Sequence, residues 1–134
     1  MELRVATHDD LMKVIRAIGH KDLPYITKSL VNRDYNHKRL YVVADGKTVY
    51  ACVSLQDEPE YGYTAIKRLC LLNKKNRGKG IGRFALHEIQ RMVKGRIGGT
   101  PWEDNIPVRH LFETEGFHLE YVFSGFWCFY VKEI

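Results

Sequence analysis

The chain has 134 residues, of which 45% are hydrophobic and 28% are charged, and its formal net charge is +5. This composition excludes a disordered chain, and the length predicts a single domain over residues 1–134. No apolar run approaches the ~20 residues of a membrane span, and the first residues lack the apolar core of a signal peptide, so we expect a cytoplasmic protein.

The N-terminal part predicts one strand and two helices. A strand is expected over Glu2–Thr7, and Thr7-x-x-Asp10 resembles a capping box that opens a helix. Apolar residues then recur at helical spacing until Gly19 ends this helix. Pro24 suits a first helical turn and predicts a second helix that runs through about Asn32.

A hairpin and a further strand are expected next. Asp45-Gly46 is a strong signal for a two-residue turn, and it separates the strand-like runs Arg39–Ala44 and Lys47–Gln56. The polar loop Asp57–Gly62 then leads into the expected strand Tyr63–Leu72.

The C-terminal half predicts two helices and three strands. The clearest helix is Ile81–Lys94, whose apolar stripe ends before the stop signal Gly95. The other expected elements are a strand at Ile97–Trp102, a helix at Asn105–Glu115, and strands at Phe117–Phe123 and Phe126–Lys132. The order of the whole chain is therefore β-α-α-β-β-β-α-β-α-β-β.

A glycine-rich loop lies between the strand that ends at Leu72 and the helix that begins at Ile81. Residues Asn76–Gly82 read Asn-Arg-Gly-Lys-Gly-Ile-Gly. A helix N-terminus has N–H groups without intrahelical partners and about half a positive charge, so it attracts anions. The glycines let the backbone approach a bulky anion, and Arg77 and Lys79 add positive charge. The loop therefore predicts a polyphosphate site.

Two other kinds of phosphate loop are excluded by their residues. A P-loop requires Gly-Lys followed by Ser or Thr, whereas Gly78-Lys79 is followed by Gly80 and then by Ile81, which have no hydroxyl. A dinucleotide-binding loop requires Gly-x-Gly-x-x-Gly, whereas the spacing here is Gly78-x-Gly80-x-Gly82. A surface loop that merely caps a helix is the remaining alternative, and the flanking strand and helix disfavour it.

On these residues the chain resembles the GNAT superfamily of N-acetyltransferases. Arg77-x-x-Gly80-x-Gly82 matches the acetyl-CoA pyrophosphate signature of that family, and Asn105 with Gly116-Phe117 matches its second motif. The resemblance implies an α/β fold with a mixed sheet whose central strands splay apart around acetyl-CoA. It also implies an enzyme, an acyl-CoA-dependent N-acyltransferase that moves the acetyl group directly to a primary amine.

The resemblance also implies which residues bind the cofactor. Main-chain groups of the strand before the loop hold the pantetheine arm and polarise the thioester carbonyl, and by register these groups belong to Cys70 and Leu72. The implied cofactor-binding residues are Cys70, Leu72, Arg77, Gly78, Lys79, Gly80, Ile81, Gly82 and Asn105. Asn105 is equally a good helix N-cap.

The attacking amine must lose a proton, because a lysine-like amine is an ammonium ion below a pKa of about 10.4. The family commonly uses a carboxylate that acts through water. Glu60 is the first candidate for this general base and Glu103 is the second. For both residues the alternative is a solvated loop carboxylate without a catalytic role.

Phe112 departs from the family, many of whose members have a tyrosine there that protonates the leaving thiolate. Phenylalanine cannot donate a proton. Either the thiolate leaves without help, or Tyr121 or Tyr63 supplies the proton, or the protein binds the cofactor without rapid turnover.

Three functions are therefore compared: an N-acetyltransferase, a catalytically weak CoA-binding regulatory or interaction module, and a basic RNA-binding protein. Five basic residues fall between Lys74 and Arg83, where the phosphates of coenzyme A would account for them, and this disfavours nucleic acid as the partner. The acceptor amine stays open: it belongs to a small molecule, to a protein N-terminus or lysine, or to an aminoacyl-tRNA. The resemblance allows a homodimer. The histidines and cysteines lack the spacing of metal ligands, so no metal is expected.

Overall fold

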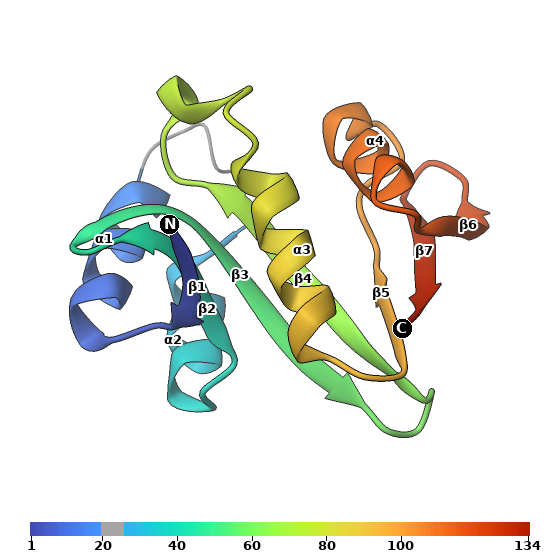
Figure 1. Ribbon diagram of the computed structural model, residues 1–134, viewed down its shortest axis with the longest axis horizontal. Helices are drawn as coiled ribbons and strands as arrows, with labels where there is room; N and C mark the ends of the chain where they lie inside the picture. Colours follow the sequence, from blue (N-terminus) through green and yellow to red (C-terminus); the bar gives the residue numbers. More distant parts are fainter. Residues whose placement is uncertain (20–25) are drawn as a thin grey trace. The chain divides into compact units, whose positions relative to one another are not determined.

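The computed structural model describes residues 1–19 and 26–134 of the chain (Figure 1). The helices and strands follow one another in the predicted order. They are β1 (Glu2–Val5), α1 (His8–Ile18), α2 (Lys28–Asn36), β2 (Leu40–Asp45), β3 (Thr48–Glu58), β4 (Tyr63–Leu71), a 3-10 turn (Lys74–Asn76), α3 (Ile81–Met92), β5 (Arg96–Gly99), α4 (Ile106–Thr114), β6 (His118–Phe123) and β7 (Trp127–Glu133). Within the described residues the strands form a mixed seven-stranded sheet in the order β1-β2-β3-β4-β5-β7-β6, which confirms the predicted α/β class.

The described chain divides into two compact units. Unit 1 comprises Met1–Leu55 and Arg68–Ala85, and unit 2 comprises Gln56–Lys67 and Leu86–Ile134. Strands β3 and β4 and helix α3 contribute residues to both units. The single domain expected from the length of the chain stays a prediction.

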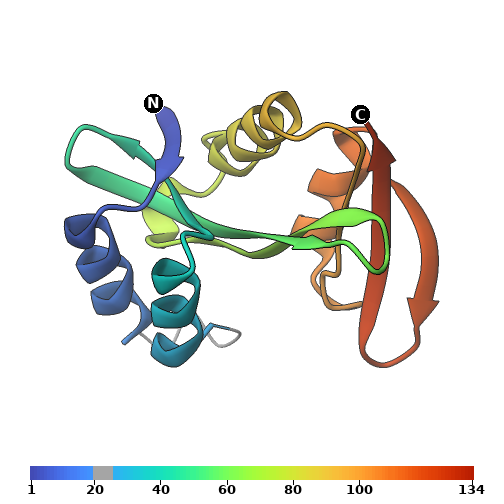
Figure 2. The ribbon, with the colours of Figure 1, turned by 90° about the horizontal axis from the view of Figure 1, so that it is seen from below.

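Unit 1 has helices on both faces of its strands. On one face Val14 of α1, Val31 of α2 and Val42 of β2 belong to the same buried cluster. Helices α1 and α2 lie side by side on this face (Figure 2). On the other face Val43 of β2 packs with Ile81 of α3. Neighbouring residues of a strand point to opposite faces, so one strand supplies both clusters.

The second helix begins and ends later than predicted. It starts at Lys28 and continues to Asn36, whereas Pro24, on which the prediction rested, lies outside the described residues. Thr27 caps the helix, because its hydroxyl accepts the N–H of Leu30 at 3.2 Å. A hydroxyl that accepts a helical N–H marks the first residues of a helix, whereas a proline suits the first turn but accepts no N–H with its side chain.

The turn between β2 and β3 is shifted by one residue from its predicted place. Strand β2 includes Asp45, which pairs with Thr48, so the turn consists of Gly46 and Lys47. Gly46 has a φ of +54°, which glycine adopts without steric cost.

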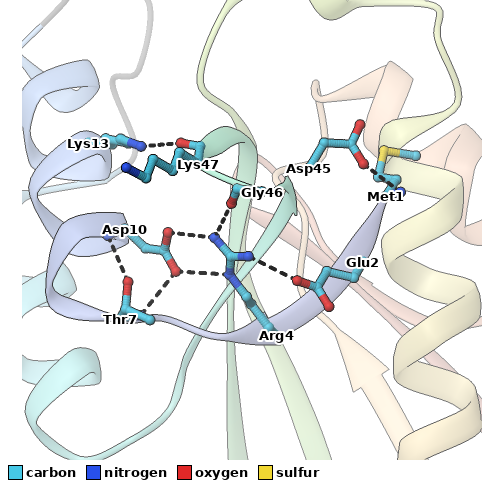
Figure 3. Close-up of polar contacts among 9 residues, drawn as sticks. All are labelled: Met1, Glu2, Arg4, Thr7, Asp10, Lys13, Asp45, Gly46 and Lys47. Atoms are coloured by element: carbon cyan, nitrogen blue, oxygen red, sulfur yellow. Dashed lines mark hydrogen bonds and ion pairs between the residues drawn. The ribbon is translucent and has the colours of Figure 1, made fainter.

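Arg4 joins β1 to α1 and to the β2–β3 turn (Figure 3). Its Nε and Nη2 atoms donate to the two carboxylate oxygens of Asp10 at 3.1 and 2.9 Å, and Nη2 also donates to the Gly46 carbonyl at 2.7 Å. Thr7 and Asp10 form the predicted capping box. Burial alone would raise the pKa of the Asp10 carboxyl, but the hydrogen bonds from Arg4 and Thr7 outweigh burial and hold this pKa below its ordinary value.

Unfolding at acid pH is expected to report on Asp10. Because its pKa in the folded protein is below the unfolded value of about 3.9, the ionised carboxylate stabilises the fold above that pH and loses this contribution as pH falls through the folded pKa. At pH 7 the Asp10→Asn variant should unfold with a free energy about 2 kcal/mol lower than the wild type, and the difference should shrink below about pH 4. Urea titrations at both pH values measure this, and an equal difference at both would contradict it.

Unit 2 contains the short strand β5, which pairs with β7. Its glycines allow close packing: an ideal Cβ on Gly98 would lie 2.8 Å from the carbonyl oxygen of Tyr130. The strand stops at Gly99 instead of the predicted Trp102, because the intervening Pro101 has no N–H to donate to a ladder.

Strand β6 is an edge of the sheet, and all six of its residues are exposed. The rings of Tyr121 and Phe123 pack against Trp127 of β7, with centroid distances of 5.5 and 5.6 Å. An exposed apolar edge strand is a surface that a second chain can cover. The homodimer allowed by the resemblance stays a prediction. Among the described helices, none is long and apolar enough to cross a membrane.

Candidate functional site

The glycine-rich loop connects β4 to α3 within unit 1. Asn73 caps the 3-10 turn Lys74–Asn76, because its side chain accepts a backbone N–H of that turn at 2.9 Å. Gly78 and Gly80 follow with φ values of +75° and +76°, which only glycine adopts without strain. Helix α3 begins here, since the N–H of Phe84 donates to the Gly80 carbonyl at 2.9 Å.

The space beside the Cα atoms of the two glycines is open. An ideal Cβ on Gly78 or on Gly80 would meet no atom within 4 Å. Arg77 and Lys79 are exposed beside these glycines, and the Lys79 ammonium is 3.5 Å from the side-chain oxygen of Asn76. Accessible glycines, two cations and a helix N-terminus together form a surface that can accept a polyphosphate.

Buried side chains hold the start of α3 in place. Ile81, the first residue of the helix, is 5% exposed and packs in a cluster with Val43 of β2 and Ala85 of α3. The first N–H groups of α3 therefore have a fixed direction before any ligand binds, which lowers the cost of binding.

Cys70 and Leu72 lie in the same unit as the loop, at the end of β4 and just beyond it. The N–H of Leu72 donates to the Tyr50 carbonyl at 2.9 Å, so a main-chain contact of Leu72 with a ligand would use its own carbonyl. The Cys70 side chain is partly buried, and burial raises the pKa of its thiol to about 11. This thiol is therefore protonated near neutral pH.

Strand β4 leaves its neighbour before it reaches these residues. The parallel ladder between β4 and β5 joins Thr64–Ile66 to Ile97–Gly99. Strand β5 ends at Gly99, whereas β4 continues to Leu71. This pairing agrees with the splayed central strands that the resemblance implies.

Asn105 and Glu103 lie at the start of α4, in unit 2. The side-chain oxygen of Asn105 accepts the N–H of Val108 at 3.5 Å, so its role as a helix N-cap is confirmed. The Glu103 carboxylate accepts the N–H of Gly125 at 2.6 Å, and the Glu103 N–H donates to the Phe126 carbonyl at 2.9 Å. Glu103 therefore holds the turn between β6 and β7.

Glu60 is exposed in the turn between β3 and β4. This turn is closed by the N–H groups of Tyr61 and Gly62, which both donate to the Glu58 carbonyl, at 3.0 and 2.9 Å. Glu60 and Asn105 belong to unit 2, whereas the glycine-rich loop belongs to unit 1. The catalytic role of Glu60 and the contact of Asn105 with the cofactor stay predictions.

Phe112 of α4 is a core residue of unit 2 and is 2% exposed. Its ring stacks on Tyr130 of β7 with a centroid distance of 5.7 Å and meets Phe117 edge-on at 4.9 Å. An ideal Cβ on Gly99 of β5 would lie 2.4 Å from Phe112 Cζ. The ring atom that carries the hydroxyl in tyrosine therefore points onto the backbone of β5.

Tyr63 and Tyr121, the two tyrosines considered as alternative proton donors, also belong to unit 2. Tyr63 packs edge-on against Phe129 with a centroid distance of 5.4 Å, and burial raises the pKa of its hydroxyl. Tyr121 is exposed on β6. No group of three or more His, Cys, Asp or Glu side chains in the described residues is arranged to hold a metal ion.

Sequence reasoning missed Arg68 of β4. Its backbone has a φ of +54°, and its side chain donates to the buried carboxylate of Asp34 on α2. The available signal was a pair of adjacent cations, Lys67 and Arg68, inside a strand that is otherwise mostly apolar. That signal does not identify the partner.

Comparison with known proteins places these observations in a family. The sequence matches the model of the acetyltransferase (GNAT) family over residues 8–117. None of the curated proteins matches it.

Solved structures of acetyltransferases share the fold. An acetyltransferase from Thermus thermophilus is 19% identical, with a TM-score of 0.80 and coverage of 99% of this chain and 96% of that chain. A GNAT family acetyltransferase from Streptococcus agalactiae is 14% identical, with a TM-score of 0.81 and coverage of 99% and 95%. The ribosomal-protein-S18-alanine N-acetyltransferase from Escherichia coli is 12% identical, with a TM-score of 0.73 and coverage of 97% and 90%. At these identities the likeness shows a common fold.

Proposed function

This chain belongs to the GNAT acetyltransferase family, and on that basis we propose that it transfers the acetyl group of acetyl-CoA directly to a primary amine. The observation that carries the proposal is the loop before α3, where Gly78 and Gly80 have positive φ and open space above them. The pyrophosphate of acetyl-CoA would lie against the first N–H groups of α3, with Arg77 and Lys79 compensating its charge.

The rest of the cofactor site follows the family pattern. The main chain of Cys70 would hold the pantetheine arm and polarise the thioester carbonyl, and Leu72 would contribute its carbonyl. A contact of Asn105 with the cofactor is proposed from the family resemblance alone. The proposed cofactor-binding residues are Cys70, Leu72, Arg77, Gly78, Lys79, Gly80, Ile81, Gly82 and Asn105.

The proposed reaction is a direct transfer. The amine nitrogen forms a bond to the acetyl carbonyl carbon, the carbon–sulfur bond breaks, and coenzyme A leaves as a thiolate. Before the attack, one proton of the ammonium ion passes to a carboxylate through water, and after it the nitrogen loses a second proton to water as the neutral amide forms. Cys70 does not act as an acyl carrier, because burial raises the pKa of its thiol to about 11 and little of the nucleophilic thiolate exists near neutral pH. A thiolate is a good enough leaving group to depart without a proton donor. The reaction is therefore compatible with Phe112 at the position where many family members have a tyrosine.

Release of coenzyme A across a panel of amines tests this function. The panel holds alkyl monoamines and polyamines, a lysine peptide, an aminoacyl-tRNA and a peptide that begins with alanine. The last is included because the Escherichia coli neighbour is named a ribosomal-protein-S18-alanine N-acetyltransferase. We expect at least one amine to accelerate release above the rate in buffer and to appear as its acetylated product by mass spectrometry. Titration calorimetry on the same sample measures acetyl-CoA binding.

The same experiment separates the second candidate function. A CoA-binding regulatory or interaction module is favoured by Phe112 itself, because phenylalanine lacks the hydroxyl of the usual proton donor. Binding of acetyl-CoA without turnover on any amine would support this module and count against the enzyme. A failure to bind acetyl-CoA would reject both.

Glu60 is the proposed general base, and Glu103 is the matched comparison. Glu60 is exposed, whereas the carboxylate of Glu103 already accepts the Gly125 N–H at 2.6 Å. Glu60→Gln should lower kcat/KM about 100-fold and remove the acidic limb of its pH profile. Glu103→Gln keeps an acceptor for Gly125 and should change kcat/KM less than about 3-fold. Rates measured from about pH 5 to 9 check this, and a wild-type acidic limb in Glu60→Gln would assign the proton to another group.

A further inference from the structure

Arg68 has an unusual backbone for a residue inside a strand. Its φ is +54°, in the left-handed region that side chains other than glycine rarely adopt. Among the described non-glycine residues only Lys38 also has a positive φ, and Lys38 lies in the turn after α2. A strained residue persists where its surroundings hold it, and such residues gather at functional sites.

Asp34 of α2 holds the guanidinium of Arg68. Arg68 Nε and Nη2 both donate to Asp34 Oδ2, with Nε at 2.9 Å. The hydroxyl of Ser54 on β3 donates to the same oxygen at 2.7 Å. The cluster therefore links α2, β3 and β4 within unit 1.

This cluster cannot release Arg68 without leaving a buried charge. The Asp34 side chain is 0% exposed, and that of Arg68 is 14% exposed. Asp34 Oδ1 has no hydrogen-bond partner among the described residues, and the cation near it is Arg33, whose Nε is 4.0 Å away. A buried carboxylate that loses its partner is strongly destabilising, so the guanidinium stays in place. The backbone of Arg68 is fixed with it.

Arg68 lies on β4 between the end of its ladder with β5 and Cys70. The last pair of the ladder with β5 is Ile66–Gly99, two residues before Arg68, and Cys70 is two residues after it. A left-handed residue inside a strand redirects the main chain that follows. We propose that Asp34 is a positioning residue for the thioester: by holding Arg68 it sets the direction of the main chain at Cys70. This inference rests on the proposed function, which assigns the contact with the acetyl carbonyl to that main chain.

Asp34→Asn tests the inference, because asparagine keeps the size of the side chain and an acceptor for Ser54 while removing the charge. Asp10→Asn is the matched control: Asp10 is also a buried aspartate of unit 1 that accepts two hydrogen bonds from an arginine, Arg4. The probe is acetyl-CoA labelled with carbon-13 at the thioester carbonyl.

In the wild type, binding should shift the carbonyl resonance, because the carbonyl becomes polarised. Asp34→Asn should lose at least about half of this shift and lower kcat about 10-fold. Its Kd for coenzyme A without the acetyl group should change less than about 3-fold, since the phosphate loop is untouched. Asp10→Asn should leave the resonance, kcat and Kd at their wild-type values.

If Asp34→Asn does not fold, Asp34→Leu combined with Arg68→Met removes both charges and leaves none unpaired, and the same loss of the carbonyl shift is expected. A folded variant of either kind with the wild-type shift and kcat overturns the inference and leaves the proposed function standing. Absence of binding by the wild type overturns the proposed function, and the inference falls with it.

Discussion

Replacing Gly80 by valine is expected to abolish acetyl-CoA binding while the protein stays folded. Gly80 has a φ of +76°, which a β-branched residue strongly disfavours, and the new side chain would fill the open space above the loop. The Kd for acetyl-CoA should rise at least about 100-fold, which corresponds to a loss of about 3 kcal/mol. Titration calorimetry measures the Kd, and circular dichroism checks the fold.

Gly95→Val is the matched control for the backbone penalty. Gly95 follows α3 in unit 2, has a φ of +98°, and has no atom within 4 Å of an ideal Cβ. This variant should lose about 1–2 kcal/mol of stability, as Gly80→Val should, but it should bind acetyl-CoA like the wild type. Unimpaired binding by Gly80→Val, or an equal loss of binding in Gly95→Val, would contradict a phosphate site at the loop.

The position of the glycine-rich loop between a strand and a helix could be predicted from the sequence, because the residues that determine it are neighbours along the chain. The glycines at positions 78 and 80 lie next to the helix that they open, and the apolar stripe of that helix is contained within it. The capping box of Thr7 and Asp10 was predictable for the same reason, since its two residues are three positions apart. The order of helices and strands followed from such local patterns.

What the sequence could not specify depends on partners distant along the chain. Arg68 and its partner Asp34 are 34 residues apart, and nothing near either of them specifies the pair. Glu103 appeared to be a free carboxylate in the sequence, but it accepts a hydrogen bond from Gly125, 22 residues away. The start of α2 was missed because Pro24 was preferred to the hydroxyl of Thr27. Catalytic candidates are therefore the least predictable part, because their chemistry depends on such tertiary contacts.

Restoring the family's tyrosine by Phe112→Tyr is expected to destabilise the protein and to leave kcat no higher. The hydroxyl would extend from Cζ toward the backbone of Gly99, where an ideal Cβ would already lie 2.4 Å from that atom. Crowding and a buried hydroxyl together should lower the free energy of unfolding by about 2–4 kcal/mol. Urea titration measures the stability, and coenzyme A release measures kcat.

Gly99→Ala tests the same contact from the other side. Its methyl group would press on the Phe112 ring and should cost about 1–3 kcal/mol in the wild type. In a Phe112→Leu background the same substitution should cost less, with a coupling energy of at least about 1 kcal/mol, because the atom that it meets is gone. A stable Phe112→Tyr variant with a raised kcat would contradict this packing, because the ring would then have to turn away from Gly99 to present its hydroxyl to the leaving thiolate.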